Sequence, residues 1–387
     1  MKKAITIIDA ENRVYLDSLD VSNTCVTKNG SVAYRVTKQR LHGGVQEGVD
    51  VVEINSGRLS FTVLLTRAMN VLKASCDDVE LKWDSPVKGP VHPNFVPVFA
   101  PGGCGWLEGF SEWIARCGLE SNGAPEFDSN GVLKYPLHGR LSNLPARKVE
   151  LVVDEENETI TLSGETLETS VFGHRFLFKT VYTATLGSTK LAVQDSVTNE
   201  ASVDDEFELL YHINTGYPLV TPGAQFYAAF EKMCPRDKNA VSELKDWNCY
   251  DEPVPGRPET CYLFDLSADS DGKTTVVLGN AASDRGVSLS FSKKEFPYFI
   301  LWKTQRPNGD IYVTGMEPSV NFPNTRSFEK KNGRVVPIAS KETKSFFFEF
   351  DVLTNVGRLN GAIDAVNALK EKAAGEIISE PMADWCE

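Results

Sequence analysis

The sequence predicts an all-β fold, a large antiparallel sandwich with only a few short helices. Three observations support this prediction. Apolar and polar residues alternate with a period of two along many segments, the segments are rich in Val, Thr, Phe and Tyr, and Gly, Asn, Asp and Pro separate them. Strands and helices do not alternate along the chain, so a parallel α/β sheet is not expected.

Eleven segments show the strand alternation clearly enough to be named. The expected strands cover residues 51–55, 59–65, 149–153, 159–162, 174–186, 190–197, 207–213, 274–278, 287–291, 298–302 and 345–352. Apolar residues at helical spacing predict one helix within 105–117 and another within 361–374. We therefore expect one β domain over residues 1–355 and a helical tail over 356–387.

The charge balance excludes several classes of partner. The 387-residue chain has a formal net charge of −13, and such a surface repels nucleic-acid phosphates and anionic lipids. No stretch is long and apolar enough to span a membrane, and Asp9 interrupts the short apolar start, so we expect a cytoplasmic protein. These features favour a small, neutral partner.

The eight cysteines form no CxxC pair and no cluster with zinc-ligand spacing. We expect free thiols, no metal site and no cofactor. The glycine-rich segment 102–105 lacks the lysine of a phosphate-binding loop, and no serine lies in a Gly-x-Ser-x-Gly turn. Glycosidase chemistry needs two placed carboxylates, and with 53 acidic residues it stays an open alternative.

Three residues are candidates for acid–base chemistry. His138 lies in a loop fixed by a preceding proline and by Gly139, and functional polar groups tend to lie on such loops. Strand alternation places His212 and Asn214 on one face of a strand, and Glu317 follows a strand and precedes a proline. The alternatives are a hydrogen-bonded core histidine and a surface carboxylate. The other three histidines are expected at surface or structural positions.

Four short motifs, in this order along the chain, resemble the aldose 1-epimerase (galactose mutarotase-like) superfamily, in a branch catalogued as a domain of unknown function. The resemblance extends over residues 51–355 and implies a β-supersandwich with its site in a cleft on one sheet. The motifs are Arg67-Ala68-Met69-Asn70, Gly105-Trp106-Leu107-Glu108, Leu137-His138-Gly139-Arg140 and Gly315-Met316-Glu317-Pro318.

The resemblance also implies the roles of the three candidates. Glu317 matches the base that removes the anomeric hydroxyl proton, and His212 matches the acid that protonates the ring oxygen. His138 matches the second histidine, which binds near the ring oxygen. The chemistry needs one acceptor and one donor with separated pKa values, and no cofactor. We therefore expect the three side chains to converge in one cleft.

Further side chains are candidates for substrate binding. Trp106 could stack on the apolar face of a pyranose, although it could equally be core packing, and Arg67 could donate to sugar hydroxyls. The substrate-holding Asp of known mutarotases has no clear match, and Glu259 is the substitute that we name. Three more candidates complete the set: Asn214, Arg140 and Lys303.

The sequence thus predicts an enzyme that interconverts the anomers of an aldose or modified aldose, as a monomer or homodimer. A second hypothesis is a non-catalytic carbohydrate-binding or sensing module on the same fold, since fold does not fix function. A third is a lyase or glycosidase on a related supersandwich. In each case the partner is a monosaccharide or another sugar.

Overall fold

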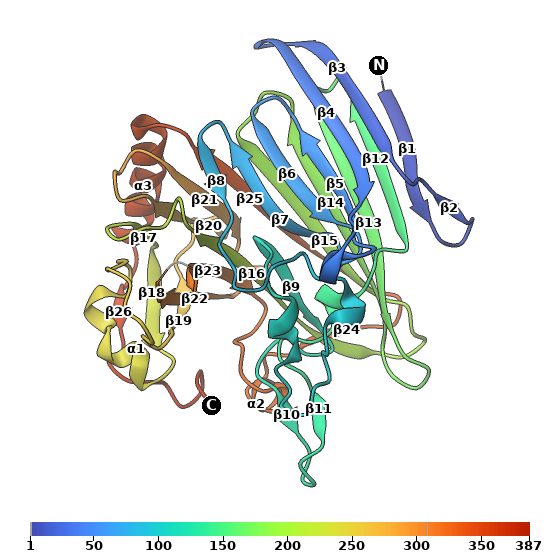
Figure 1. The fold of residues 1–387 in the computed structure, drawn as a ribbon. Helices are drawn as coiled ribbons and strands as arrows, with labels where there is room; N and C mark the ends of the chain where they lie inside the picture. The colour runs from blue at the N-terminus through green and yellow to red at the C-terminus, as the bar shows by residue number, and fades with distance from the viewer. Residues whose placement is uncertain (1, 308) are drawn as a thin grey trace.

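Two large sheets form the protein, which is described here by a computed structural model covering residues 2–307 and 309–387 (Figure 1). The first sheet has ten strands. Their order is β17 (Gln225–Tyr227), β20 (Lys273–Gly279), β21 (Gly286–Ser292), β25 (Thr343–Leu353), β15 (Lys190–Asn199), β14 (Arg175–Thr185), β13 (Thr159–Thr169), β12 (Lys148–Asp154), β1 (Lys2–Asp9) and β2 (Val14–Tyr15).

The second sheet has fourteen strands and carries the site described below. Its main path is β26 (Glu376–Ile377), β18 (Phe230–Pro235), β19 (Thr260–Leu266), β22 (Tyr298–Gln305), β23 (Tyr312–Ser319), β16 (Asp205–Gly216), β9 (Ile114–Leu119), β7 (Asn70–Cys76), β6 (Leu59–Leu64), β5 (Asp50–Asn55), β4 (Gly30–Arg40) and β3 (Leu19–Thr27). Two short strands, β24 (Val336–Ile338) and β8 (Val79–Leu81), pair beside β16 and β7.

The remaining elements are short. A hairpin of β10 (Glu126–Phe127) and β11 (Leu133–Tyr135) stands apart from both sheets (Figure 1). The helices are α1 (Lys238–Ser242), α2 (Arg326–Lys331) and α3 (Val356–Lys370), with 3-10 turns at Gly44–Gln46, Pro93–Phe95, Gly105–Gly109, Leu141–Asn143 and Leu244–Asp246. Among the described residues, no helix has the length and apolar character needed to cross a membrane.

The core lies between the two sheets, where strand alternation turns one side of each strand inward. On β25, Phe348 and Phe350 are buried while Glu349 between them is not. The ring of Tyr211 on β16 lies 4.8 Å from that of Phe348, which joins the second sheet to the first. The all-β fold predicted from the sequence is therefore confirmed, and each of the eleven expected strands coincides with a strand.

One helix prediction was wrong and the other was correct. Residues 105–117 contain only a 3-10 turn, Gly105–Gly109, followed by an extended segment and β9. The helical spacing there was coincidental, because Phe110 faces a cavity while Ile114 packs in the core between the sheets. The tail helix is present as α3, which begins at Val356 and packs on the first sheet beside β20 and β21 (Figure 1).

Candidate active site

A cavity of about 250 Å³ opens on the face of the second sheet that is turned away from the core. Five of the side chains expected at the site line it: Trp106, His138, His212, Glu259 and Glu317. Trp106 comes from a 3-10 turn, His138 from a long loop, His212 and Glu317 from the neighbouring strands β16 and β23, and Glu259 from the position directly before β19. The cavity is slightly smaller than the roughly 300–1,000 Å³ typical of drug-sized ligands, which suits a monosaccharide.

The register of β16 against β23 brings His212 and Glu317 together. Leu210 pairs with Ser319 and Ile213 pairs with Met316, so the same register sets His212 opposite Glu317. Nε2 of His212 lies 3.2 Å from Oε1 of Glu317. The sequence indicated that Glu317 follows a strand, but it lies inside β23, in the middle of the sheet.

Asn214, two residues along β16, fixes the proton on the other side of the His212 ring. Its amide nitrogen donates to the backbone carbonyls of Glu112 and His212, each at 3.0 Å, so its oxygen must be the atom that faces the imidazole. Nδ1 of His212 lies 2.5 Å from that oxygen and therefore carries a proton. In neutral His212 the bare nitrogen is Nε2, the one beside Glu317.

Burial determines the protonation of this pair. Glu317 is 3% exposed, and burial raises its pKa well above the ordinary value of 4.5. Burial, with a smaller contribution from His138, lowers the pKa of His212 well below 6.5. A bare carboxylate and an unprotonated imidazole nitrogen would repel each other at 3.2 Å, so the pair holds one proton at neutral pH.

Oε1 of Glu317 is closed to solvent and faces Nε2 of His212 at 3.2 Å, so the shared proton occupies it. The indole nitrogen of Trp106 is also buried, and it has no hydrogen-bond partner within residues 2–307 and 309–387. Buried polar atoms without partners are rare and costly.

His138 faces the same cavity from a strained loop. Its φ is +57°, an uncommon conformation for a residue other than glycine, and such strain concentrates at functional sites. The next residue, Gly139, has φ +68°, and a Cβ there would clash with the carbonyl of Ser121. The loop can therefore follow this path only with glycine at position 139.

The tautomer of His138 is also fixed. Nδ1 lies 2.8 Å from the backbone carbonyl of Asn122, so it must donate, which leaves Nε2 as an acceptor. Burial lowers the pKa of His138 to about 4, and the ring is neutral at neutral pH. His138 therefore offers a hydrogen-bond acceptor to a ligand hydroxyl.

Aromatic rings pack around the two histidines. Trp106 is 1% exposed, and its ring lies 4.6 Å from His138 and 6.1 Å from His212. Phe110 lies 4.9 Å from His212, and Trp302 lies 5.1 Å from it. These rings cover part of each histidine and give the cavity an apolar wall.

The opposite rim of the cavity is charged. Arg236, directly after β18, donates to Glu259 at 2.8 Å and to Asp237 at 3.1 Å. The indole nitrogen of Trp302 donates to the second oxygen of Glu259 at 2.8 Å. Arg236 and Trp302 thus hold the carboxylate of Glu259, the residue expected in place of the substrate-holding Asp of known mutarotases. The charge of Arg236 is balanced by the carboxylates of Glu259 and Asp237.

Four other expected residues do not line the cavity: Asn214, which is fully buried beside His212, and three charged side chains. Arg67 is fully buried, and its guanidinium donates to Glu112 at 2.5 Å, to two backbone carbonyls and to an amide oxygen. Lys303 points to the opposite face of β22 from Trp302 and donates to three backbone carbonyls of residues 246–249. Arg140 lines a separate hollow beside residues 93–100. These side chains already serve internal contacts or face elsewhere.

Sequence reasoning missed Arg236 and Trp302. Trp302 lay on an expected strand, where alternation would have placed it on the same face as Ile300, opposite to the core residue Leu301. Arg236 gave no signal, because it follows a proline in a segment that was not predicted as a strand.

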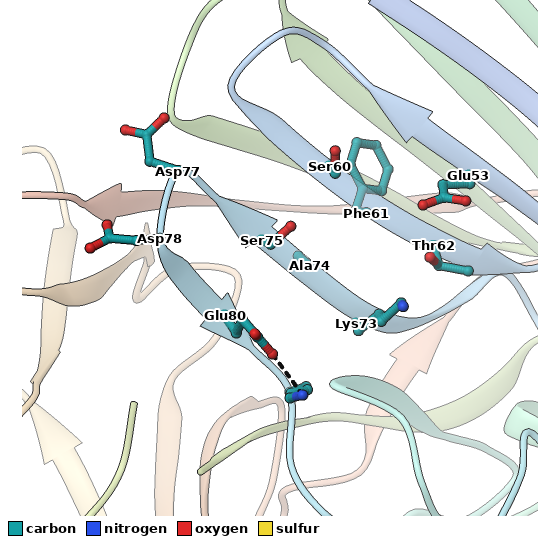
Figure 2. Close-up of a pocket in the computed structure, with 11 residues that line it drawn as sticks. Glu53, Ser60, Phe61, Thr62, Lys73, Ala74, Ser75, Asp77, Asp78 and Glu80 are labelled. Carbon is teal, nitrogen blue, oxygen red and sulfur yellow. Dashed lines mark ion pairs between the residues drawn. The ribbon is translucent and has the colours of Figure 1, made fainter. Parts of the chain in front are cut away.

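A second hollow, of about 480 Å³, lies on the outer face of β5, β6, β7 and β8 (Figure 2). Figure 2 shows mostly hydroxyl and charged side chains there. Glu80 pairs with Lys82 at 2.6 Å, and Asp78 pairs with Arg285 at 3.0 Å. Because these charges already have partners and no histidine lines the hollow, it is a poor candidate for acid–base chemistry.

Comparison with solved structures agrees with this architecture. A crystal structure from Klebsiella pneumoniae, described provisionally as an aldose 1-epimerase, matches with a TM-score of 0.93 at 27% identity, covering 99% of this chain and 100% of that chain. A galactose mutarotase-like protein from Clostridium acetobutylicum matches with a TM-score of 0.55 at 16% identity, covering 82% of this chain and 98% of that chain, which shows the fold alone. No curated protein shows significant similarity.

The sheet topology and the Klebsiella likeness identify an aldose 1-epimerase and galactose mutarotase-like fold, as the motifs indicated. A family model described as a domain of unknown function, DUF4432, matches residues 46–352, which is most of the chain. The chain therefore belongs to the DUF4432 family.

Proposed function

We propose that this protein interconverts the anomers of an uncharged aldose. One observation carries the proposal: a carboxyl and an imidazole, Glu317 and His212, lie 3.2 Å apart at the wall of a monosaccharide-sized cavity. A base and an acid side by side can each reach one of the two oxygens bonded to C1 of a pyranose, the anomeric hydroxyl and the ring oxygen.

Ring opening uses the form of the pair in which Glu317 is ionised and His212 is protonated at Nε2. Glu317 takes the proton of the anomeric hydroxyl, the electron pair forms the C1 carbonyl, and the bond from C1 to the ring oxygen breaks. His212 gives its Nε2 proton to that ring oxygen. Rotation of the aldehyde and the reverse transfers then close the ring as the other anomer.

One shared proton is sufficient for the whole cycle. After opening, Glu317 is protonated and His212 is neutral, which is the form that burial favours at rest. Closing the ring returns the proton to His212, and exchange across the 3.2 Å gap links the two forms. Asn214 holds the ring so that Nε2, and not Nδ1, exchanges the proton.

The remaining cavity residues are assigned to binding. Neutral His138 accepts from one hydroxyl through Nε2, and Glu259 accepts from others while Arg236 and Trp302 hold it in place. The Arg236 charge is already offset by Glu259 and Asp237, so a phosphate or carboxylate on the sugar would find no unbalanced cation. This arrangement selects neutral sugars.

Anomer exchange measured by NMR, over a panel of neutral and phosphorylated hexoses and pentoses, tests the proposal. We expect accelerated exchange for neutral sugars, and a loss of about 10²–10⁴-fold in the Glu317→Gln variant with sugar binding retained. Glu53→Gln makes the same chemical change on the exposed face of β5 and serves as the matched control. Absence of exchange across the panel, or wild-type exchange in Glu317→Gln, would refute the assignment.

A second candidate function is sugar binding without catalysis. Burial of Glu317 favours it, because a protonated carboxyl can donate a hydrogen bond but cannot act as a base. The same measurement separates the two functions. Saturable binding of a neutral sugar with unaccelerated exchange supports a binding module, whereas accelerated exchange excludes it.

A further inference from the structure

The C-terminal segment, residues 378–387, docks beside the active-site sheet. The ring of Trp385 packs 4.8 Å from that of Phe322, and its backbone carbonyl accepts from the side chain of Asn324 at 2.8 Å. Arg334 donates to the backbone carbonyl of Asp384 at 2.7 Å. Figure 1 shows the C-terminus close to α2, in agreement with these contacts.

These contacts continue to the cavity. Pro323 and Ala124 both line it, and the backbone nitrogen of Ala124 donates to the carbonyls of Pro323 and Asn324 at 3.2 and 3.1 Å. The residue before Ala124, Gly123, accepts from the backbone nitrogen of His138 at 2.9 Å. The docked tail therefore supports the loops that position His138.

Two thiols meet where the tail crosses β18. Sγ of Cys386 lies 3.9 Å from Sγ of Cys234, and both side chains are buried. A disulfide bond is about 2.05 Å long, so an approach of roughly 2 Å would join them. Cys234 stands two residues before Arg236 at the cavity rim.

We propose that Cys234 and Cys386 form an oxidative cross-linking site, at which a peroxide closes a disulfide that clamps the C-terminal tail against the active-site sheet. The cross-link would join residues far apart in sequence. It would hold the tail, and through it the loop of Asn324, in the docked position.

The reaction balances with one peroxide for two thiols. The Cys234 thiolate attacks one peroxide oxygen, an S–O bond forms as the O–O bond breaks, and the departing hydroxide leaves as water with the thiol proton. Cys386 then attacks the sulfur of this sulfenic acid, the S–S bond forms, the S–O bond breaks, and a second water leaves with the second thiol proton. Sulfur is oxidised and peroxide is reduced. The hydrogen bond from Cys386 lowers the pKa of Cys234, which favours Cys234 as the attacking thiolate.

The test uses the full chain treated with hydrogen peroxide, with free thiols then blocked by a maleimide and the peptides mapped by mass spectrometry. We expect a Cys234–Cys386 linked peptide that dithiothreitol removes, and a melting temperature about 3–6 °C higher in the linked protein. Cys104 is exposed and reports that peroxide has acted.

Matched variants keep the proposal testable. Cys104→Ser should leave the link and the melting shift intact, while Cys386→Ser, at the chain end, should abolish both without unfolding the sheets. Oxidation of Cys104 without the linked peptide would overturn the proposal. So would a linked peptide that leaves the melting temperature unchanged, because the bond would then clamp nothing.

Discussion

Gly315 provides the sharpest test of the acid–base pair without changing either member. It lies on β23 opposite Asn214 on β16, on the same face as Glu317. A Cβ at this position would stand 3.1 Å from Cε1 of His212 and would overlap Oε1 of Glu317. In Gly315→Ala the carboxylate must therefore move by roughly 1 Å, and a displacement of that size costs on the order of 10²-fold in rate.

Anomer exchange of the best neutral sugar, with circular dichroism and thermal melting on the same samples, measures this effect. Overpacking costs about 1–3 kcal/mol of stability, so the variant should fold with a lowered melting temperature. Gly361→Ala, at an exposed position of α3 with nothing within 4 Å of the added methyl, is the control and should exchange as wild type. If folded Gly315→Ala exchanges within about twofold of wild type, the pair does not perform the chemistry.

Because the pKa of Glu317 is raised and that of His212 is lowered, the pair keeps one proton on both sides of pH 6.5. A plot of kcat/KM against pH should therefore be flat around pH 6.5, and should fall in acid when His212 gains a second proton and in base when Glu317 loses its own. An inflection near pH 6.5 would contradict this. Asn214→Leu removes the acceptor that fixes the His212 tautomer, so kcat should fall by about 10²-fold while KM changes little; equal changes in both would indicate a merely structural residue. Burial acts against the charged forms of Glu168 and His174, but their contact at 3.1 Å lowers the pKa of Glu168 and raises that of His174. The stability that Glu168 contributes is present above its ordinary pKa of 4.5 and is lost as pH falls through its pKa in the folded protein; the stability that His174 contributes is present below 6.5 and is lost as pH rises through its pKa in the folded protein. Between these two limits Glu168→Gln should therefore lower the free energy of unfolding most, by about 3–5 kcal/mol measured by urea unfolding. A loss that does not depend on pH would refute the pairing.

The sheets and the acid–base candidates could be predicted because their signals are local. Alternation reveals a strand wherever one face is buried, and the same alternation placed His212 and Asn214 on one face. The short motifs then singled out Glu317 and His138. What alternation cannot give is register, because it does not state which strand lies beside which. The pairing of β16 with β23 is what turned two separated motifs into one pair.

The charged binding residues were harder to predict because their partners are distant in sequence. Arg67 was expected at the substrate, but Glu112, 45 positions away, holds it in the interior. Arg236 was not expected, yet Glu259 holds it at the cavity rim. An arginine in a sequence shows its charge but not its partner, so the two positions could not be told apart before the fold was known.

The Glu-Pro order in β23 connects the sequence to the chemistry. Pro318 has no N–H, so it cannot donate a backbone hydrogen bond to β16. The regular pairing of β16 with β23 is interrupted between Met316 and Ser319, and within this gap His212 and Glu317 face each other. Burying two charged groups here would be costly, and burial therefore favours the form in which the one shared proton lies on Glu317 and both side chains are uncharged. The cavity can therefore exclude water and still hold an acid and a base. Under the proposed function, this condition would let one proton move between the pair and a neutral sugar in both directions, with the aromatic wall around His212 in place.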